Sequence, residues 1–175
     1  MMIAITGTPG TGKTVLAEEL RSRGYEVLDI NKHIRENGML EEKDEARDTY
    51  CVDVDALDES LERYRDRELI LAEGHLSHCV ECDLTIVIRC APGILAKRLK
   101  ERGYSENKIT ENVQAEILDV ILCEASSTDV PVCEIDSSED SVSGLADKVE
   151  DIIKGNIDKY GPGNIDWTEE LEKWF

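Results

Sequence analysis

The sequence predicts an α/β fold built around a parallel β-sheet, and two observations carry this prediction. Short apolar segments alternate with amphipathic segments of helical period along most of the 175 residues, as in successive β-α units. Residues 7–14 read Gly-Thr-Pro-Gly-Thr-Gly-Lys-Thr and lie between the first apolar segment and the first helical one. A G-x-x-x-x-G-K-T loop in that context is a P-loop, which binds phosphate groups.

The first β-α unit surrounds this loop. The apolar run at residues 1–5 predicts a strand at about 3–6, and Leu16 and Leu20 begin the apolar face of a helix. We expect this helix to run from Lys13 to about Arg23 and to stop at Gly24. The Lys13 ammonium can reach the β- and γ-phosphates of a nucleotide, the Thr14 hydroxyl can bind Mg²⁺, and the helix N-terminus favours negative charge.

The rest of the chain continues the alternation. Further strands are predicted at about residues 26–30, 69–72, 84–89 and 130–135. Further helices are predicted at about residues 55–67, 92–102, 108–125 and 142–153, with Asp55 as the cap of the first and Pro92 in the first turn of the second. The length suits a single domain.

Two segments depart from this alternation. Residues 31–52 are polar, charged and only weakly helical, which indicates an insertion on the rim rather than in the core. After the break at Gly161-Pro162-Gly163, four apolar residues follow at helical spacing: Trp167, Leu171, Trp174 and Phe175. This stripe of the tail, residues 156–175, is expected to dock on the body, and a surface for a partner protein is the alternative.

The composition limits the partners. The 39 acidic and 20 basic residues give a net charge of −19, which disfavours direct, extensive binding to nucleic acid. Such a charge suits a basic protein partner or a salty cytoplasm, although solubility alone is the simplest account. The chain has no apolar run long enough to span a membrane and no visible signal peptide, so we expect a soluble, cytoplasmic protein.

The six cysteines are expected to be free thiols. One cluster places four potential zinc ligands within eight residues: His75, His78, Cys79 and Cys82. Zinc is disfavoured because no second pair lies at finger-like distance and so short a loop cannot easily wrap a tetrahedral ion.

Candidate catalytic residues follow two of the predicted elements. Glu73 comes directly after the 69–72 strand, where an acid can hold the water shell of Mg²⁺ or merely cap a helix, and His75 lies two residues further. Arg98 and Arg102 lie one helical turn apart. Arg102, beside Gly103, suits a mobile lid that excludes water and adds positive charge, whereas Arg98 could equally be solvated.

Arg35 in the insertion could bind the phosphate of an acceptor, or it could pair with Glu36 or Glu41. Other P-loop classes fit less well. The chain lacks the Asn-Lys-x-Asp segment of a GTPase, and a motor or AAA-type ATPase would show a longer chain and an apolar run closing in Asp-Glu. Small nucleotide kinases match best in size, in the insertion and in the arginine lid.

Three segments together carry a family resemblance. The 7–14 loop, the run Leu-Ile-Leu-Ala-Glu-Gly-His at 69–75, and Leu-Lys-Glu-Arg-Gly-Tyr at 99–104 followed by Lys108, Asn112 and Glu116-Ile117 resemble the atypical adenylate kinases of isoenzyme-6 type. Glu124-Ala125 also fits, and the similarity covers about residues 1–155. These kinases occur in archaea and in the eukaryotic nucleus and are linked to maturation of small-subunit ribosomal RNA.

The resemblance implies a P-loop NTPase fold of the nucleoside monophosphate kinase kind, a three-layer sandwich with a central five-stranded parallel sheet. It implies an AMP-binding insertion at about residues 29–52 and a short lid at about 101–111. The residues that would line the ATP phosphates are Gly10, Thr11, Gly12, Lys13, Thr14 and Val15. Arg102 would be the lid arginine, Arg35 would face AMP, and Glu73 and His75 would place magnesium and water.

The implied activity is adenylate kinase, ATP + AMP ⇌ 2 ADP, with Mg²⁺ as cofactor and ATP hydrolysis alongside, and we expect a broad-specificity nucleoside monophosphate kinase. The implied partner is a basic small-subunit ribosomal protein of the S11/S14 type, bound by a monomer. One alternative is an assembly factor whose ATP binding switches its affinity for that ribosomal protein, and another is a small-metabolite kinase. Two departures bear on rate: Glu73 stands where the family has Asp, and Val15 replaces a second hydroxyl.

Overall fold

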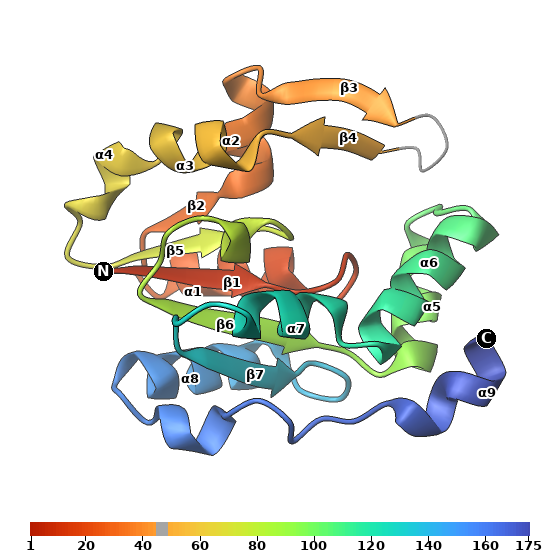
Figure 1. The fold of residues 1–175 in the computed structure, drawn as a ribbon. Coiled ribbons are helices and arrows are strands. Elements are labelled where there is room, and N and C mark those ends of the chain that lie inside the picture. The colour runs from red at the N-terminus through yellow and green to blue at the C-terminus, as the bar shows by residue number, and fades with distance from the viewer. Residues whose placement is uncertain (45–48) are drawn as a thin grey trace.

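Five parallel strands form the central sheet of the computed structural model, in the order β2-β5-β1-β6-β7 (Figure 1). The strands are β1 (Met2–Thr6), β2 (Val27–Asp29), β5 (Ile70–Glu73), β6 (Leu84–Arg89) and β7 (Val132–Asp136). The structure describes residues 1–44 and 49–175, with only the backbone for 41–44 and 49–50. The predicted five-stranded parallel sheet is confirmed.

Helices cover both faces of this sheet, so the three-layer sandwich is confirmed as well. The longer helices are α1 (Lys13–Ser22), α2 (Ile30–Glu36), α3 (Val54–Ser60), α5 (Pro92–Glu101), α6 (Glu106–Ile117), α7 (Val120–Ser126) and α8 (Val142–Ile153). The turns α4 (Glu62–Arg65), η1 (Ser77–Cys79), η2 (Ile157–Tyr160), η3 (Thr168–Glu170) and α9 (Leu171–Trp174) are short.

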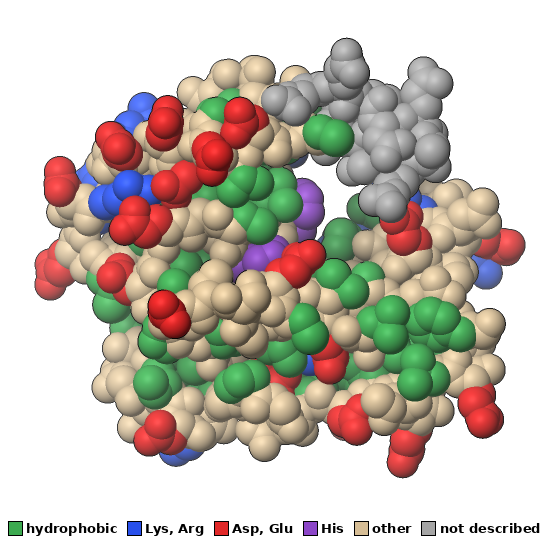
Figure 2. All heavy atoms as spheres, in the orientation of Figure 1, with side chains coloured by type: hydrophobic (Ala, Val, Ile, Leu, Met, Phe, Trp, Pro, Cys, Tyr) green, Lys and Arg blue, Asp and Glu red, His purple; other side chains and the backbone are tan. Residues whose placement is uncertain are grey.

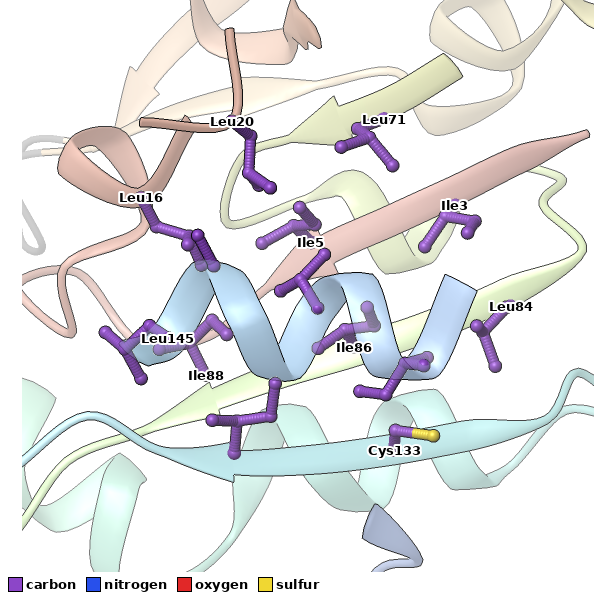
Figure 3. Packing of buried hydrophobic residues seen from close by; sticks show 14 residues of the cluster. Ile3, Ile5, Leu16, Leu20, Leu71, Leu84, Ile86, Ile88, Cys133 and Leu145 are labelled. Atoms are coloured by element: carbon purple, nitrogen blue, oxygen red, sulfur yellow. The ribbon is translucent and has the colours of Figure 1, made fainter. Parts of the chain in front are cut away.

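The largest core cluster lies between the sheet and the pair α1 and α8 (Figure 3). Leu16 and Leu20 from α1 and Leu145 from α8 pack on alternate residues of β6, Ile86 and Ile88. The residue between them, Val87, points to the other face and packs against α7. Because side chains alternate across a strand, a central strand buried on both faces is mostly apolar, so it stands out in the sequence as a short apolar segment.

The rim insertion is more structured than its polar sequence predicts. Its first part is α2, whose Ile30 and Ile34 belong to the core cluster on the second face of the sheet. Its second part contains the antiparallel pair β3 (Leu40–Asp44) and β4 (Thr49–Val52). The expectation of an insertion outside the core is therefore wrong at Ile34, and the expectation of a weakly helical segment is wrong at β3 and β4. Residues 45–48 of the prediction lie outside the described residues.

Two predicted helices are each divided into two in the structure. The 108–125 helix divides into α6 and α7 at Asp119, whose φ of 54° is left-handed and whose carboxylate accepts a hydrogen bond from Arg89. The 55–67 helix divides into α3 and α4 at Leu61. Its cap is Asp53, which accepts from the Ala56 amide at 3.1 Å, so the prediction of Asp55 as the cap is wrong.

The C-terminal tail docks on the body, as predicted. It runs past β7 and returns to α5 and α6 (Figure 1), where Trp167, Leu171 and Trp174 pack against the apolar residues of these two helices. The Gln114 side chain donates to the Trp174 carbonyl at 2.6 Å. Phe175 is 66% exposed and takes no part in the cluster. Within the described chain, no helix is long and apolar enough to cross a membrane.

Replacing Trp174 by Ala is expected to lower the free energy of unfolding by about 1–3 kcal/mol, because the apolar contacts of a partly buried indole with α5 and α6 are lost. Urea unfolding followed by circular dichroism measures this change. The matched control is Phe175→Ala, which should change stability by less than about 0.5 kcal/mol because the ring is exposed. Equal effects of the two substitutions would contradict docking as a source of stability.

Candidate active site

An open cleft of about 860 Å³ lies at the carboxyl end of the parallel strands, where ligands bind in open α/β sheets. Figure 2 shows the molecule hollowed between the insertion and the α5–α6 side, with histidine side chains beside the hollow. The cleft is lined by Pro9, Gly10, Gly12, Lys13, Thr14, Asn31, Ile34, Arg35, Leu40, Val52, Glu73, His75, Arg102, Gly103, Tyr104, Ser105 and Lys108. The P-loop, the insertion, the end of β5 and the α5–α6 turn thus meet at one place.

The P-loop needs its glycines for two physical reasons. Gly7 and Gly10 have φ values of 140° and 97°, in the region that side chains disfavour. A Cβ on Gly7 would lie 2.3 Å from the Ile88 carbonyl oxygen, and one on Gly10 would lie 2.9 Å from Leu95 and Leu99. The loop therefore packs directly on β6 and α5, and α1 begins immediately after it with its N-terminus at the cleft.

The side chain of Lys13 folds back against the backbone of the P-loop. This side chain is 6% exposed, and its ammonium donates to the carbonyl oxygens of Gly7 at 2.7 Å and Thr8 at 3.0 Å. Burial lowers the pKa of Lys13 to about 8, against the opposing effect of the Glu73 and Glu116 carboxylates. A bound polyphosphate would add negative charge beside the ammonium and so favour its charged form.

Thr14 and Glu73 form an oxygen pair beside Lys13. The Thr14 hydroxyl lies 3.5 Å from Glu73 Oε1, and both residues line the cleft. Burial raises the pKa of Glu73, while Lys13 opposes that shift most strongly. Hydroxyl and carboxylate oxygens are the ligands that Mg²⁺ prefers when phosphate oxygens complete its shell, so these residues fit the ion.

His75 follows Glu73 at the same edge and is exposed to the cleft. Protein atoms surround the ring on its other sides, and this desolvation lowers its pKa to about 4, with smaller contributions from Lys13 and His78. The imidazole is therefore neutral at neutral pH and can orient a water molecule without adding charge.

The two predicted phosphate-binding arginines line the cleft from different walls. Arg102 caps the C-terminus of α5, and Arg35 lies in the last turn of α2. Glu36 lies 3.7 Å from Lys32, and the side chain of Glu41, the other partner considered for Arg35, lies outside the described residues.

Arg98 has a structural role that neither sequence interpretation anticipated. Its guanidinium donates to the Ser137 carbonyl at 2.9 Å and lies 3.4 Å from the Thr11 carbonyl. These bonds fasten the P-loop to the segment after β7. Arg98 is only partly exposed, and it is not among the residues that line the cleft.

Two members of the predicted phosphate site do not line the cleft. Thr11 is fully buried, and its hydroxyl donates to the Thr8 carbonyl at 3.0 Å. Val15 is 45% exposed on α1. Their side chains therefore have no place in the cleft, and only their backbone amides remain available to a phosphate.

Members of the His75, His78, Cys79 and Cys82 cluster, for which zinc was disfavoured, have protein partners in the structure. His78 lies 2.9 Å from the Thr6 hydroxyl and 3.1 Å from Glu124, on opposite ring nitrogens, and Cys82 Sγ lies 3.5 Å from the Thr85 hydroxyl. Across residues 1–44 and 49–175, no group of three or more His, Cys, Asp or Glu side chains is arranged to hold a metal ion.

A buried ion network behind the P-loop escaped the sequence analysis. Arg89, 1% exposed, lies 2.8 Å from Glu116 and 3.1 Å from Glu134, and it also contacts Asp119. Glu134 in turn accepts from the Asn164 and Ile165 amides of the tail. One signal was available: Arg89 and Glu134 interrupt segments predicted as buried strands, where an unpaired charge is too costly to tolerate.

Comparisons with known proteins identify the family. The family described as an AAA domain matches residues 3–119. A protein of Archaeoglobus fulgidus named "Putative adenylate kinase" is 45% identical over 175 residues, covering 98% of this chain and 94% of the relative. A protein of Methanocaldococcus jannaschii with the same name is 41% identical over 172 residues, covering 97% and 94%. The chain belongs to the family of these archaeal proteins named "Putative adenylate kinase". The match extends past the expected residues 1–155 into the tail.

Solved structures agree on the fold. A shikimate kinase from Acinetobacter baumannii in complex with shikimate aligns with a TM-score of 0.62 at 18% identity, over 89% of this chain and 93% of that one. A deoxyadenosine kinase from M. mycoides aligns with a TM-score of 0.56 at 16% identity, over 88% and 99%. The chain therefore has the P-loop kinase fold. The family description also shows that chain length was a poor argument against AAA-type proteins.

Binding of Mg-ATP should weaken as the pH rises through about 8, because only the charged form of Lys13 attracts phosphate and its pKa in the free protein is about 8. Beyond that point the apparent affinity falls by up to about tenfold per pH unit. Calorimetric titrations from about pH 6 to 10 measure this change. The control, Lys13→Met, should bind Mg-ATP weakly and show no fall in affinity near pH 8. A wild-type affinity that stays level up to about pH 10 would contradict the assignment of Lys13 as the phosphate-binding cation.

Proposed function

We propose that the protein is a Mg²⁺-dependent nucleoside monophosphate kinase that transfers the γ-phosphoryl group of ATP to AMP and forms two molecules of ADP. One observation carries the proposal. The Lys13 loop lies at the floor of a single cleft whose walls carry Arg35 on the insertion and Arg102 beside the α5–α6 turn. A donor phosphate on the loop would thus have cationic side chains on two further walls, as phosphoryl transfer between two nucleotides requires.

Each residue has a distinct part in this reaction. Lys13 and the loop amides would bind the β- and γ-phosphates, and Arg102 would neutralise charge that develops on the transferring group. Arg35 would bind the phosphate of AMP through its planar fork. Bound Mg²⁺, held by Thr14 and through water by Glu73, supplies charge neutralisation between the phosphates.

The cleft also has room for both nucleotides. Its volume of about 860 Å³ is in the upper part of the range for small-molecule sites, about 300–1,000 Å³. The names of the archaeal relatives support AMP as the acceptor. A shikimate-like acceptor is less favoured, because likeness to shikimate kinase extends only to the fold.

Hydrolysis of ATP would accompany transfer. His75 is neutral and faces the cleft two residues after Glu73, so it can orient a water molecule when no acceptor is bound. We further propose that residues 29–52 form the AMP-binding unit and residues 101–111 the lid of one domain that spans residues 1–175. We also propose that this domain acts as a cytoplasmic monomer.

AMP-dependent formation of ADP from ATP tests the proposal in a coupled assay. Arg35→Ala should raise the KM for AMP by about 10- to 100-fold while the affinity for ATP stays unchanged, because one charge-assisted phosphate contact is lost. Arg63→Ala is the matched control, since Arg63 lies over the Tyr64 ring and does not line the cleft. Activity that survives Lys13→Ala unchanged would remove the proposal.

A second candidate follows from the charge of −19, which favours a basic protein partner. In this case the chain is of the isoenzyme-6 type and acts in maturation of the small ribosomal subunit. It binds a small-subunit ribosomal protein of the S11/S14 type and releases it on ATP hydrolysis, with kinase turnover incidental.

Retention of that ribosomal protein on immobilised protein, measured with ATP and with a non-hydrolysable analogue, separates the two candidates. The second candidate requires release with ATP and retention with the analogue. Retention that ignores the nucleotide would exclude it.

A further inference from the structure

The second residue of the P-loop is tied to the helix that follows the α5–α6 turn. Thr8 is 3% exposed, and its hydroxyl donates to Glu116 Oε2 at 2.5 Å. Glu116 lies on α6, 108 residues further along the chain, and is also 3% exposed. A hydrogen bond from a hydroxyl to a carboxylate is of the strong, charge-assisted kind, and water does not compete with it here.

The Thr8 carbonyl is one of the two carbonyls that hold Lys13, the other being that of Gly7. The Thr8 carbonyl oxygen accepts from the Lys13 ammonium at 3.0 Å and from the Thr11 hydroxyl at 3.0 Å. The direction of this carbonyl depends on the backbone torsions of Thr8. The hydrogen bond from the Thr8 side chain to Glu116 restrains these torsions. A chain of hydrogen bonds therefore links Glu116 to Lys13 through Thr8, although neither Thr8 nor Glu116 lines the cleft.

Glu116 is itself fixed. Its other carboxylate oxygen accepts from Arg89 Nε at 2.8 Å and from the Cys90 amide at 3.0 Å, both at the end of β6. Arg89 also donates to the Glu116 carbonyl at 3.1 Å. The Glu116 carboxylate cannot rotate away from Thr8 without breaking its hydrogen bonds to Arg89 and Cys90. Water would not replace these bonds because Glu116 is buried, so the position of the carboxylate is fixed.

We propose that Glu116 is a positioning residue for the phosphate site, which through Thr8 holds the P-loop carbonyls that orient the Lys13 ammonium. Because α6 begins at Glu106, within the proposed lid of residues 101–111, the same carboxylate joins the helix that extends from this lid to the loop that would bind ATP. The effect on ATP binding stands on this geometry alone, and the effect on turnover rests on the proposed function.

The test compares two substitutions at one position. Thr8→Val keeps the shape and removes the hydroxyl donor, whereas Thr8→Ser keeps the donor. Thr8→Val should weaken Mg-ATP binding by about 10- to 100-fold, the effect of losing a charge-assisted bond, and Thr8→Ser should stay within about threefold of wild type. Isothermal calorimetry measures both, and thermal unfolding confirms that both variants fold.

Thr85→Val is the matched control. Thr85 is 2% exposed on β6, its hydroxyl lies near Cys82, and it is remote from the cleft lining, so its loss should leave ATP binding unchanged. Should Thr8→Val fail to fold, Thr8→Ala removes the same hydroxyl with less bulk. Binding by the valine or alanine variant equal to that of Thr85→Val would overturn the proposal.

A double-mutant cycle with Glu116→Gln assigns the effect to this pair. In the Gln background, Thr8→Val should add much less than it does alone, whereas independent, multiplying effects would contradict the route through Glu116. The KM for AMP should stay within about threefold in Thr8→Val, since Arg35 is untouched, while a general loss of structure would raise it together with the ATP constant. If wild type forms no ADP from AMP, the proposed function fails, and the ATP affinities still decide the role of Glu116.

Discussion

The close approach of the P-loop to β6 and α5 is the constraint on which the rest of this structure depends. Gly7 leaves no room for a side chain beside the Ile88 carbonyl, and Gly10 leaves none beside Leu95 and Leu99. This contact lets the loop fold over Lys13 at the carboxyl edge of the sheet. The cleft is therefore lined by the Lys13 ammonium, the start of α1 and the end of β5. These groups lie together because parallel strands end at the same edge of the sheet.

Charge is distributed unevenly around that point. The chain carries a net charge of −19, yet Lys13, Arg35, Arg102 and Lys108 all line the cleft. Behind the loop, Arg89 is buried among the carboxylates of Glu116 and Glu134. A buried ion pair of this kind contributes little net stability, because desolvation offsets attraction, but removing one partner leaves a costly charge. Its effect here is geometric: it joins β6, β7, α6 and the tail.

Much of the site could be predicted from sequence. The spacing of Gly7, Gly12 and Lys13, and the place of Glu73 after an apolar strand, depend on residues that are close in the chain. Two positions differ from the sequence prediction. The helix cap is Asp53 rather than Asp55, and Asp119, which accepts a hydrogen bond from Arg89, divides the 108–125 helix. The phosphate contacts of Thr11 and Val15 stay a prediction for their backbone amides, because a motif fixes the backbone of a loop and not each side chain.

The sequence by itself predicted the five strands of the sheet, the P-loop and the apolar stripe of the tail, because hydrophobic period and glycine conformation are local properties. Only the tertiary structure decided the β3–β4 pair, the structural role of Arg98 and the bond between Thr8 and Glu116. These depend on groups far apart in the chain, and whether a polar side chain finds a partner or water is settled by burial, which no short stretch of sequence records.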